Sequence, residues 1–407
     1  MAYNDSGFQA TSPCPQPGTW TGTAIHRRRR QPVLPPRTQE HKILRYRLLA
    51  CDQRSFLTGS RRVDMQAAHI INTVREDDRR KANVEELLTQ QRLHHSSFQT
   101  FDLDSIINGI LLEATYHVQW DVYGTFCIVP AVDDARAMLS ALRTSNQQWT
   151  VNEFNDRPAR PLDVGVAPFD RPKWDVVILH PRGLLPDGET LPIAQGRYFE
   201  TQTSSPPQNA QVTWTYWTAS SDQLVSPSDP NDFFPPFTAQ DARSMTHNRP
   251  SPPISSLAMV VNANAKLQSF MKDHRASATP RITMFANLVS ELMDEIFFVP
   301  RGFRSRLDDY DSLSLQAPAQ PHPIEAVSGT GNPAPTGHQF GQPSTSVGSM
   351  ELEPDAPEQP DDDDGLTPLE FRLLAQRARD PELRPRDRSN AASMLIFGVH
   401  GFTKPYA

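Results

Sequence analysis

Two apolar segments on either side of a charged insert constrain the fold of this chain more than any other feature. The first segment, VDMQAAHII, has the composition of a strand, and RSFLTGSRR precedes it with a turn at Gly59, so we expect a hairpin. In the second segment, Ile110, Ala114, His117 and Asp121 recur at spacings that share one face of a helix. The insert between the two segments is compatible with one further helix.

Strand and helix patterns continue beyond this region. TFCIVP and WDVVIL predict strands, and Asp187-Gly188 predicts a hairpin turn between two arms. Further helices are expected over Asp133–Arg143, Ser255–Asp273, Arg281–Val299 and Thr367–Asp380. The third of these carries a continuous apolar stripe made of Phe285, Leu288, Val289, Leu292 and Ile296. We favour burial of this stripe within the same protein, and a protein partner for helix 281–299 is the alternative.

Composition limits how much of the chain can be folded. The sequence has 38 Pro, and only 37% of its residues are hydrophobic, so a core can be built over part of the length and long segments are expected to be disordered. We predict an α+β protein with added helices and a small β-rich extension. Its expected parts are a disordered basic N-terminal arm (1–40), a folded domain (41–205), a Pro-rich linker (206–254), a helical segment (255–303), a disordered acidic segment (304–365), and a short helix and tail (366–407).

Charge and cysteine content narrow the class of protein. The net charge is -7, yet residues 1–150 carry a small basic excess that includes the run His26–Arg30. Local neutralisation of phosphates would allow nucleic-acid binding by this part.

The three cysteines are far apart, which argues against a disulfide framework or a Cys-rich zinc site and indicates a reduced, intracellular protein of the nucleus or cytoplasm. The sequence has no apolar run of the roughly 20 residues that a membrane span requires.

Three polar residues in the first region suggest a specific chemistry. His69 ends the expected strand, Asn108 opens the expected helix, and His117 lies within that helix. A neutral imidazole can act as a general base, an amide oxygen can accept its second N–H, and another imidazole can bind a divalent metal ion together with Asp121. Each residue alone is ordinary: a structural histidine, a helix N-cap, and an i,i+4 helical pair. Their order is what indicates metal-assisted phosphodiester hydrolysis.

At this point the chain resembles a known family. CDQRSFLTG, MQAAHII, NGILLEATYHVQWD and GTFCIVP, in this order, are similar to the HNH endonuclease domain, most of all to its fungal branch. The resemblance implies a ββα-metal core and an HNH nuclease-like domain over 41–205. It implies His69 as general base, Asn108 as orienting residue, and His117 as ligand of a divalent ion such as Mg²⁺, Mn²⁺ or Zn²⁺. The implied reaction is endonucleolytic hydrolysis of nucleic acid, with DNA favoured over RNA.

The chain departs from the family pattern in ways that bear on activity. Ala68 stands where many HNH domains have a second metal ligand, and Gln66 stands where the fungal pattern often has Glu. His117 and Asp121 alone would bind a metal ion weakly, because most coordination positions would be left to water. The alternative is therefore an inactive domain that serves as a nucleic-acid- or protein-binding scaffold. His94 and His95 in the insert could approach the metal, although an exposed helix is the favoured setting for both.

Overall fold

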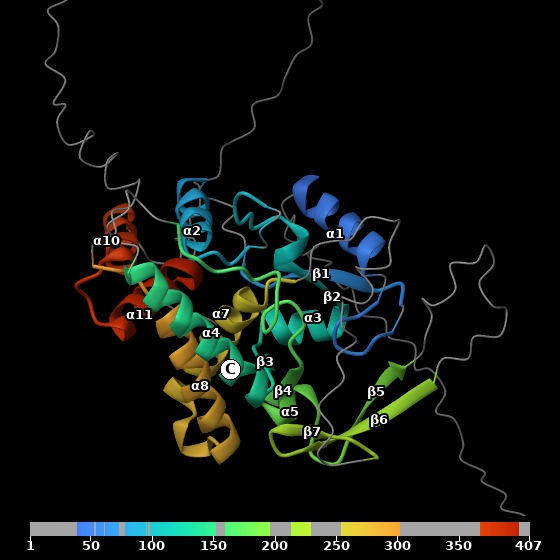
Figure 1. The fold of residues 1–407 in the computed structure, drawn as a ribbon. Coiled ribbons are helices and arrows are strands. Elements are labelled where there is room, and N and C mark those ends of the chain that lie inside the picture. The colour runs from blue at the N-terminus through green and yellow to red at the C-terminus, as the bar shows by residue number, and fades with distance from the viewer. Residues whose placement is uncertain are drawn as a thin grey trace, which may run out of the picture. The chain divides into compact units, whose positions relative to one another are not determined.

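The computed structural model describes ten segments of the chain, which are residues 39–52, 54–60, 62–72, 78–94, 96, 98–151, 159–195, 213–228, 254–301 and 367–398. All of them belong to one unit that starts at Gln39. The elements, in chain order and labelled as in Figure 1, are α1 (Gln39–Cys51), β1 (Met65–His69), α2 (Asp78–Gln90), η1 (Ile106–Asn108), β2 (Gly109–Glu113), α3 (Ala114–Asp121), β3 (Phe126–Pro130), α4 (Val132–Val151), β4 (Trp174–Ile178), α5 (Pro181–Leu184), β5 (Thr190–Gln195), β6 (Thr213–Ser220), β7 (Gln223–Val225), α7 (Ser256–Asp273), η3 (Arg275–Ser277), α8 (Pro280–Ile296), α10 (Pro368–Arg379) and α11 (Pro385–Phe397). The fold is thus mixed helix and sheet.

A two-stranded sheet followed by a helix forms the part of the fold that matters most for function. β1 pairs antiparallel with β2, so that Met65 faces Glu113 and His69 faces Gly109. α3 follows β2 directly and packs on both strands. Leu48 of α1 also packs on the strands. A Cβ atom at Gly109 would come 2.8 Å from Cδ1 of Leu48. Glycine at this position therefore lets α1 lie close to the sheet.

A second, five-stranded sheet has the order β3-β4-β7-β6-β5, with antiparallel pairing throughout. α7 packs against β3 and against α8, while α8 also contacts α4 and α11. One buried apolar cluster extends from Phe56 to Ile396 and includes residues of α2, α3, α4, α7, α8, α10 and α11. Four of the five residues of the α8 stripe, namely Phe285, Val289, Leu292 and Ile296, are buried within this cluster. The stripe is therefore buried inside the protein.

The strand pairing differs from the sequence expectation. Residues 54–60 form turns instead of the first arm of a hairpin, and β1 pairs with β2, across the insert. The expected helix from Asn108 begins only at Ala114, because residues 109–113 form β2. All five residues of β2 are buried, so the run GILLE fills a fully covered strand, a setting in which apolar periodicity does not distinguish strand from helix.

Further differences lie in the larger sheet and in the insert. Gly188 has a positive φ of 86°, as a turn requires, but β5 pairs with β6, so the two arms expected around this turn are not partners. Residues 213–228, within the expected linker 206–254, contain β6 and β7. His94 follows α2 and is buried, so its expected exposed helical setting is wrong, while His95 lies outside the described residues. The expected acidic segment lies outside the described residues, as does the expected N-terminal arm except for Gln39 and Glu40, which begin α1. Within the described part, no helix has both the length and the apolar character needed to cross a membrane.

Candidate active site

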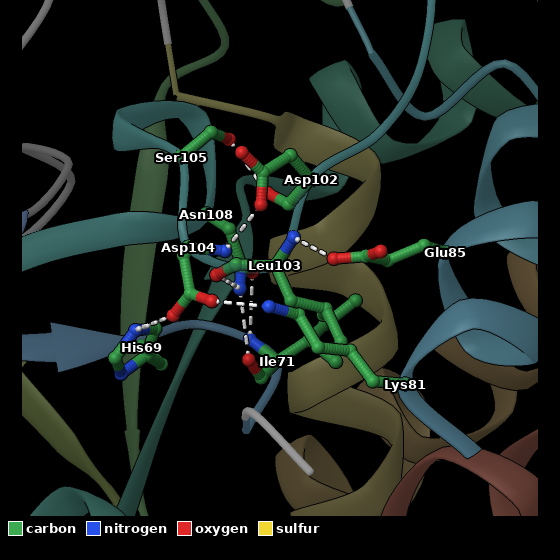
Figure 2. A network of polar contacts seen from close by, with 9 residues as sticks. All are labelled: His69, Ile71, Lys81, Glu85, Asp102, Leu103, Asp104, Ser105 and Asn108. Atoms are coloured by element: carbon green, nitrogen blue, oxygen red, sulfur yellow. Dashed lines mark hydrogen bonds and ion pairs between the residues drawn. The ribbon is translucent and has the colours of Figure 1, made fainter. Parts of the chain in front are cut away.

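His69, at the end of β1, is part of a polar network that the charged insert supplies. Its side chain is only 7% exposed, and its Nε2 atom lies 3.7 Å from Oδ1 of Asp104. The second carboxylate oxygen of Asp104 accepts a hydrogen bond from Nζ of Lys81 on α2 at 2.5 Å. Figure 2 shows Asp104 between the imidazole and the ammonium group. The distance to His69 is longer than an ordinary hydrogen bond and corresponds to a polar contact.

The charges in this network reinforce one another. Contact with His69, followed by the hydrogen bond from Lys81, lowers the pKa of Asp104 to about 2, although burial of the carboxyl opposes the shift. The hydrogen bond to Asp104 is also the main cause of the raised pKa of Lys81. Asp104 is therefore a carboxylate and Lys81 an ammonium ion at neutral pH. Sequence analysis missed both residues, because neither their spacing nor a motif connects them to His69.

Asn108 acts on the backbone around His69. Its Oδ1 atom accepts a hydrogen bond from the N–H of Ile71 at 2.9 Å, and its Nδ2 atom donates to the carbonyl oxygens of Ile71 and Leu103, each at 2.8 Å. Its own carbonyl accepts from the N–H of Ile70 at 2.8 Å. We expected the amide oxygen to accept an N–H of His69; instead, the carboxylate facing that imidazole belongs to Asp104. A fully buried Asn108 fixes the chain that follows β1.

His117 and Asp121 lie one turn apart on α3, as the sequence predicts, with Nε2 of His117 3.8 Å from Oδ2 of Asp121. The other ring nitrogen, Nδ1, contacts Oε1 of Gln66 on β1 at 2.7 Å. An amide oxygen accepts hydrogen bonds, so this contact puts the ring proton on Nδ1 and the lone pair on Nε2, beside the carboxylate. An imidazole lone pair next to a carboxylate oxygen suits a divalent metal ion.

His117 and Asp121 fit a metal ion as two ligands, and the described residues provide no third ligand beside them. Among the described residues, no group of three or more His, Cys, Asp or Glu side chains is arranged to hold a metal ion. Ala68, which stands next to His69, is fully buried and offers no donor atom. Two protein ligands leave the remaining coordination positions to water or to substrate oxygens, as is common for Mg²⁺ sites.

A buried carboxylate joins the loop before β1 to the start of α3. Glu113, the N-cap residue of α3, accepts a hydrogen bond from Oγ of Ser55 at 2.5 Å, and the hydroxyl groups of Thr58 and Ser60 also bond to it. Three hydroxyl donors compensate for the removal of this carboxylate from water. The hydroxyl residues of the segment TGS are the sequence feature that could have indicated this contact. The contact anchors the helix that carries His117.

α3 is also held from the side of α7. Nζ of Lys266 lies 3.8 Å from the ring centroid of Trp120, the residue before Asp121. Lys266 is fully buried, and desolvation lowers its pKa well below the usual value, while Asp121 acts in the opposite direction. This contact between the Lys266 amine and the face of the Trp120 ring is a further tie between a core helix and the helix that carries the two candidate ligands.

Comparison with known proteins gives one match. Residues 55–129 match the family model described as HNH endonuclease. The matched range begins at Ser55, in the loop whose hydroxyl groups bond to Glu113, contains β1, the insert, β2 and α3, and ends in β3. Searches of curated proteins and of solved structures gave no match for the chain.

Proposed function

We propose, on the match of residues 55–129 to the HNH endonuclease family model, that this chain is an endonuclease that hydrolyses phosphodiester bonds of nucleic acid with a divalent metal ion. We propose DNA as the preferred substrate over RNA, and Mg²⁺, Mn²⁺ or Zn²⁺ as the ion. An HNH domain implies contact with nucleic acid. Our proposal goes beyond nucleic-acid contact in three respects: the cleavage reaction, the metal requirement and the roles of the residues.

One observation carries the proposal. In the order β1, β2, α3, His69 lies at the end of the first strand, Asn108 directly precedes the second, and His117 lies with Asp121 on the helix. This order supports the ββα-metal core that we propose, and it arises here from two strands that are separated by a long insert. The side chain of Gln66 connects the first strand to His117, so that strand and helix meet at the candidate metal ligands.

The residues have separate roles in the proposed reaction. His69 takes a proton from the attacking water as its oxygen bonds to phosphorus; the ester P–O bond breaks, and the leaving oxygen gains a proton from solvent. Asn108 holds the backbone after β1. His117 and Asp121 would hold the metal ion, which when bound supplies positive charge for the oxygens of the transition state.

A second candidate function is a nucleic-acid- or protein-binding scaffold without cleavage. Two observations favour it: Ala68 provides no ligand beside His69, and the His69 imidazole is 7% exposed and engaged with Asp104. A general base must reach a water molecule at the phosphate, so an imidazole with this little exposure needs an opening on its Nδ1 side. The scaffold predicts binding that is unaffected by a chelator, and no cleavage.

A cleavage assay with matched histidine variants distinguishes the two functions. The full chain is incubated with supercoiled plasmid and, separately, with RNA in Mg²⁺, Mn²⁺, Zn²⁺ or EDTA, beside His69→Ala and His274→Ala. We expect metal-dependent nicking that His69→Ala lowers by about 100-fold or more. His274 is exposed at the end of α7, and its variant should nick like the parent. Equal nicking by both variants, or nicking in EDTA, contradicts the proposal.

A further inference from the structure

The turn before η1 holds Asp104 rigidly in front of His69. Oδ1 of Asp102 accepts the N–H of Asp104 at 2.8 Å, and the N–H of Leu103 donates to Oε1 of Glu85 on α2 at 3.0 Å. The carbonyl of Leu103 accepts from Nδ2 of Asn108. Leu103, the residue before Asp104, is therefore tied to α2 and to Asn108, as Figure 2 shows. A carboxylate on a backbone this constrained can hold an imidazole in one orientation.

We propose that Asp104 is the positioning residue of His69, holding its imidazole with the proton on Nε2 so that Nδ1 keeps the lone pair, while Lys81 fixes the Asp104 carboxylate from the opposite side. The inference rests on the proposed function for its catalytic meaning. Its structural content, a defined tautomer of His69, stands independently of whether nucleic acid is cleaved. The element that provides both residues is the charged insert between the two strands.

The chemistry follows from which nitrogen faces the carboxylate. A carboxylate accepts hydrogen bonds and does not donate them, so the proposal puts the ring proton on Nε2, which lies 3.7 Å from Oδ1 in a polar contact, and leaves the lone pair on Nδ1. When Nδ1 takes a proton from water, the imidazole becomes a cation beside a carboxylate that stays ionised. That carboxylate stabilises the charge that forms, as an orienting acid does for the base of a catalytic triad.

The ammonium group of Lys81 allows the Asp104 carboxylate to stay ionised next to His69 although it is partly buried. Asp104 is 22% exposed and Lys81 is 26% exposed, and each charge offsets the removal of the other from water. Glu85 and Asp102 also face Lys81 and keep it charged. With Lys81 bound to Oδ2, the contact with His69 is left to Oδ1, so the carboxylate has one oxygen for each partner.

The ring tautomer of His69 tests the inference directly. Full-length protein with ¹⁵N-labelled histidine is examined by NMR, and the His69 signals are assigned by their loss in His69→Gln. In the parent we expect the proton on Nε2. Asp104→Asn can donate its amide N–H to Nε2, so we expect the ring proton to move to Nδ1. Asp104→Glu keeps an acceptor and should keep the proton on Nε2. Asp102→Asn is the matched control, since its amide oxygen can still accept from the Asp104 N–H.

Kinetics then separate positioning from folding. In the cleavage assay, Asp104→Asn should lower kcat by up to about 100-fold, the lower end of a general base's contribution, with little change in KM. Asp104→Glu should recover most of the rate, and melting temperatures should agree among the variants. A parent tautomer with the proton on Nδ1, or Asp104→Asn with an unmoved proton, overturns the inference. A moved proton with full cleavage also overturns the catalytic role. If the parent cleaves nothing, the proposed function fails, and the tautomer still decides the position of His69.

Discussion

Oε1 of Gln66 lies 2.7 Å from Nδ1 of His117, so a side chain of β1 sets the tautomer of an imidazole on α3. The contact links the strand that ends in His69 to the helix that carries the candidate metal ligands. If His117 and Asp121 bind a metal ion as we propose, Gln66 would influence that binding without contacting the metal itself, because it directs the lone pair of His117 toward Asp121.

Changing Gln66 should therefore change the affinity for a divalent metal ion. Gln66→Leu removes the acceptor at Nδ1, and we expect Mn²⁺ affinity to fall by about 10- to 100-fold. Gln66→Glu places a carboxylate at the same nitrogen and should strengthen binding. Isothermal titration of the full chain with Mn²⁺ measures both changes. Gln90→Leu, which loses only a hydrogen bond to Glu86 on α2, is the control. Equal affinities for Gln66→Leu and the parent would refute the assigned tautomer.

Arg160 should be among the residues that stabilise the fold most. Its guanidinium is fully buried and donates to the carbonyl oxygens of Gln91, Glu295 and Ile296 and to Oδ1 of Asn146. Arg160→Met leaves these acceptors without their donor, so we expect a loss of roughly 2–4 kcal/mol in the free energy of unfolding. Urea denaturation followed by circular dichroism measures it.

Arg143 provides the matched control for Arg160. Its guanidinium forms ion pairs with Glu291 and Glu295 while 52% exposed, so water screens both pairs. Arg143→Met should cost at most about 1 kcal/mol in the same denaturation experiment. If the two variants are equally stable, the buried guanidinium does not hold α4 to the end of α8 as the contacts indicate.

The side-chain oxygens of Glu113 should be needed to anchor α3. Glu113→Leu leaves the hydroxyls of Ser55, Thr58 and Ser60 without their acceptor, and we expect a loss of about 2–4 kcal/mol in the free energy of unfolding. Glu113→Gln keeps one oxygen acceptor and should lose less. Glu291→Leu, at a half-exposed position on α8, should change stability by less than about 1 kcal/mol. A Glu113→Leu protein as stable as the parent would mean that the loop is anchored elsewhere.

His94 should make the protein less stable in mild acid. Burial lowers its pKa to about 4, below the ordinary value of 6.5, so the folded protein resists protonation of this ring. The unfolded chain binds the proton as pH falls below about 6.5, and stability from this group is lost between about 6.5 and 4. The urea midpoint measured from pH 7 to pH 4 should fall less steeply in His94→Gln than in the parent, while His274→Gln should follow the parent.

Several parts of the fold and site could be predicted from the sequence, for identifiable reasons. The strand ending at His69 and the two helices over 255–299 have patterns whose periods are unambiguous. The HNH resemblance is confirmed by the family match over residues 55–129. The helix carrying His117 was found, but its start was placed too early, because a fully buried strand such as β2 lacks the alternation that identifies strands.

The contacts of the site were beyond sequence reasoning. Lys81 and Asp104 reach His69 through the tertiary placement of α2 and the turn before η1, and no local pattern encodes that distance. The same holds for Arg160, whose partners come from three separate segments. The roles of His69, Asn108, His117 and Asp121 stay predictions that the experiments above test.

The apolar cluster that includes Phe56 also includes Leu374 of α10 and Leu395 of α11. These two helices are separated in sequence from the other helices of the core by the long segment between α8 and α10. A shortened protein that ends after the matched family region would lose the surface that these helices cover, and would be prone to aggregate. Conversely, a protease that cuts once between α8 and α10 should yield two fragments that co-elute and separate only in denaturant.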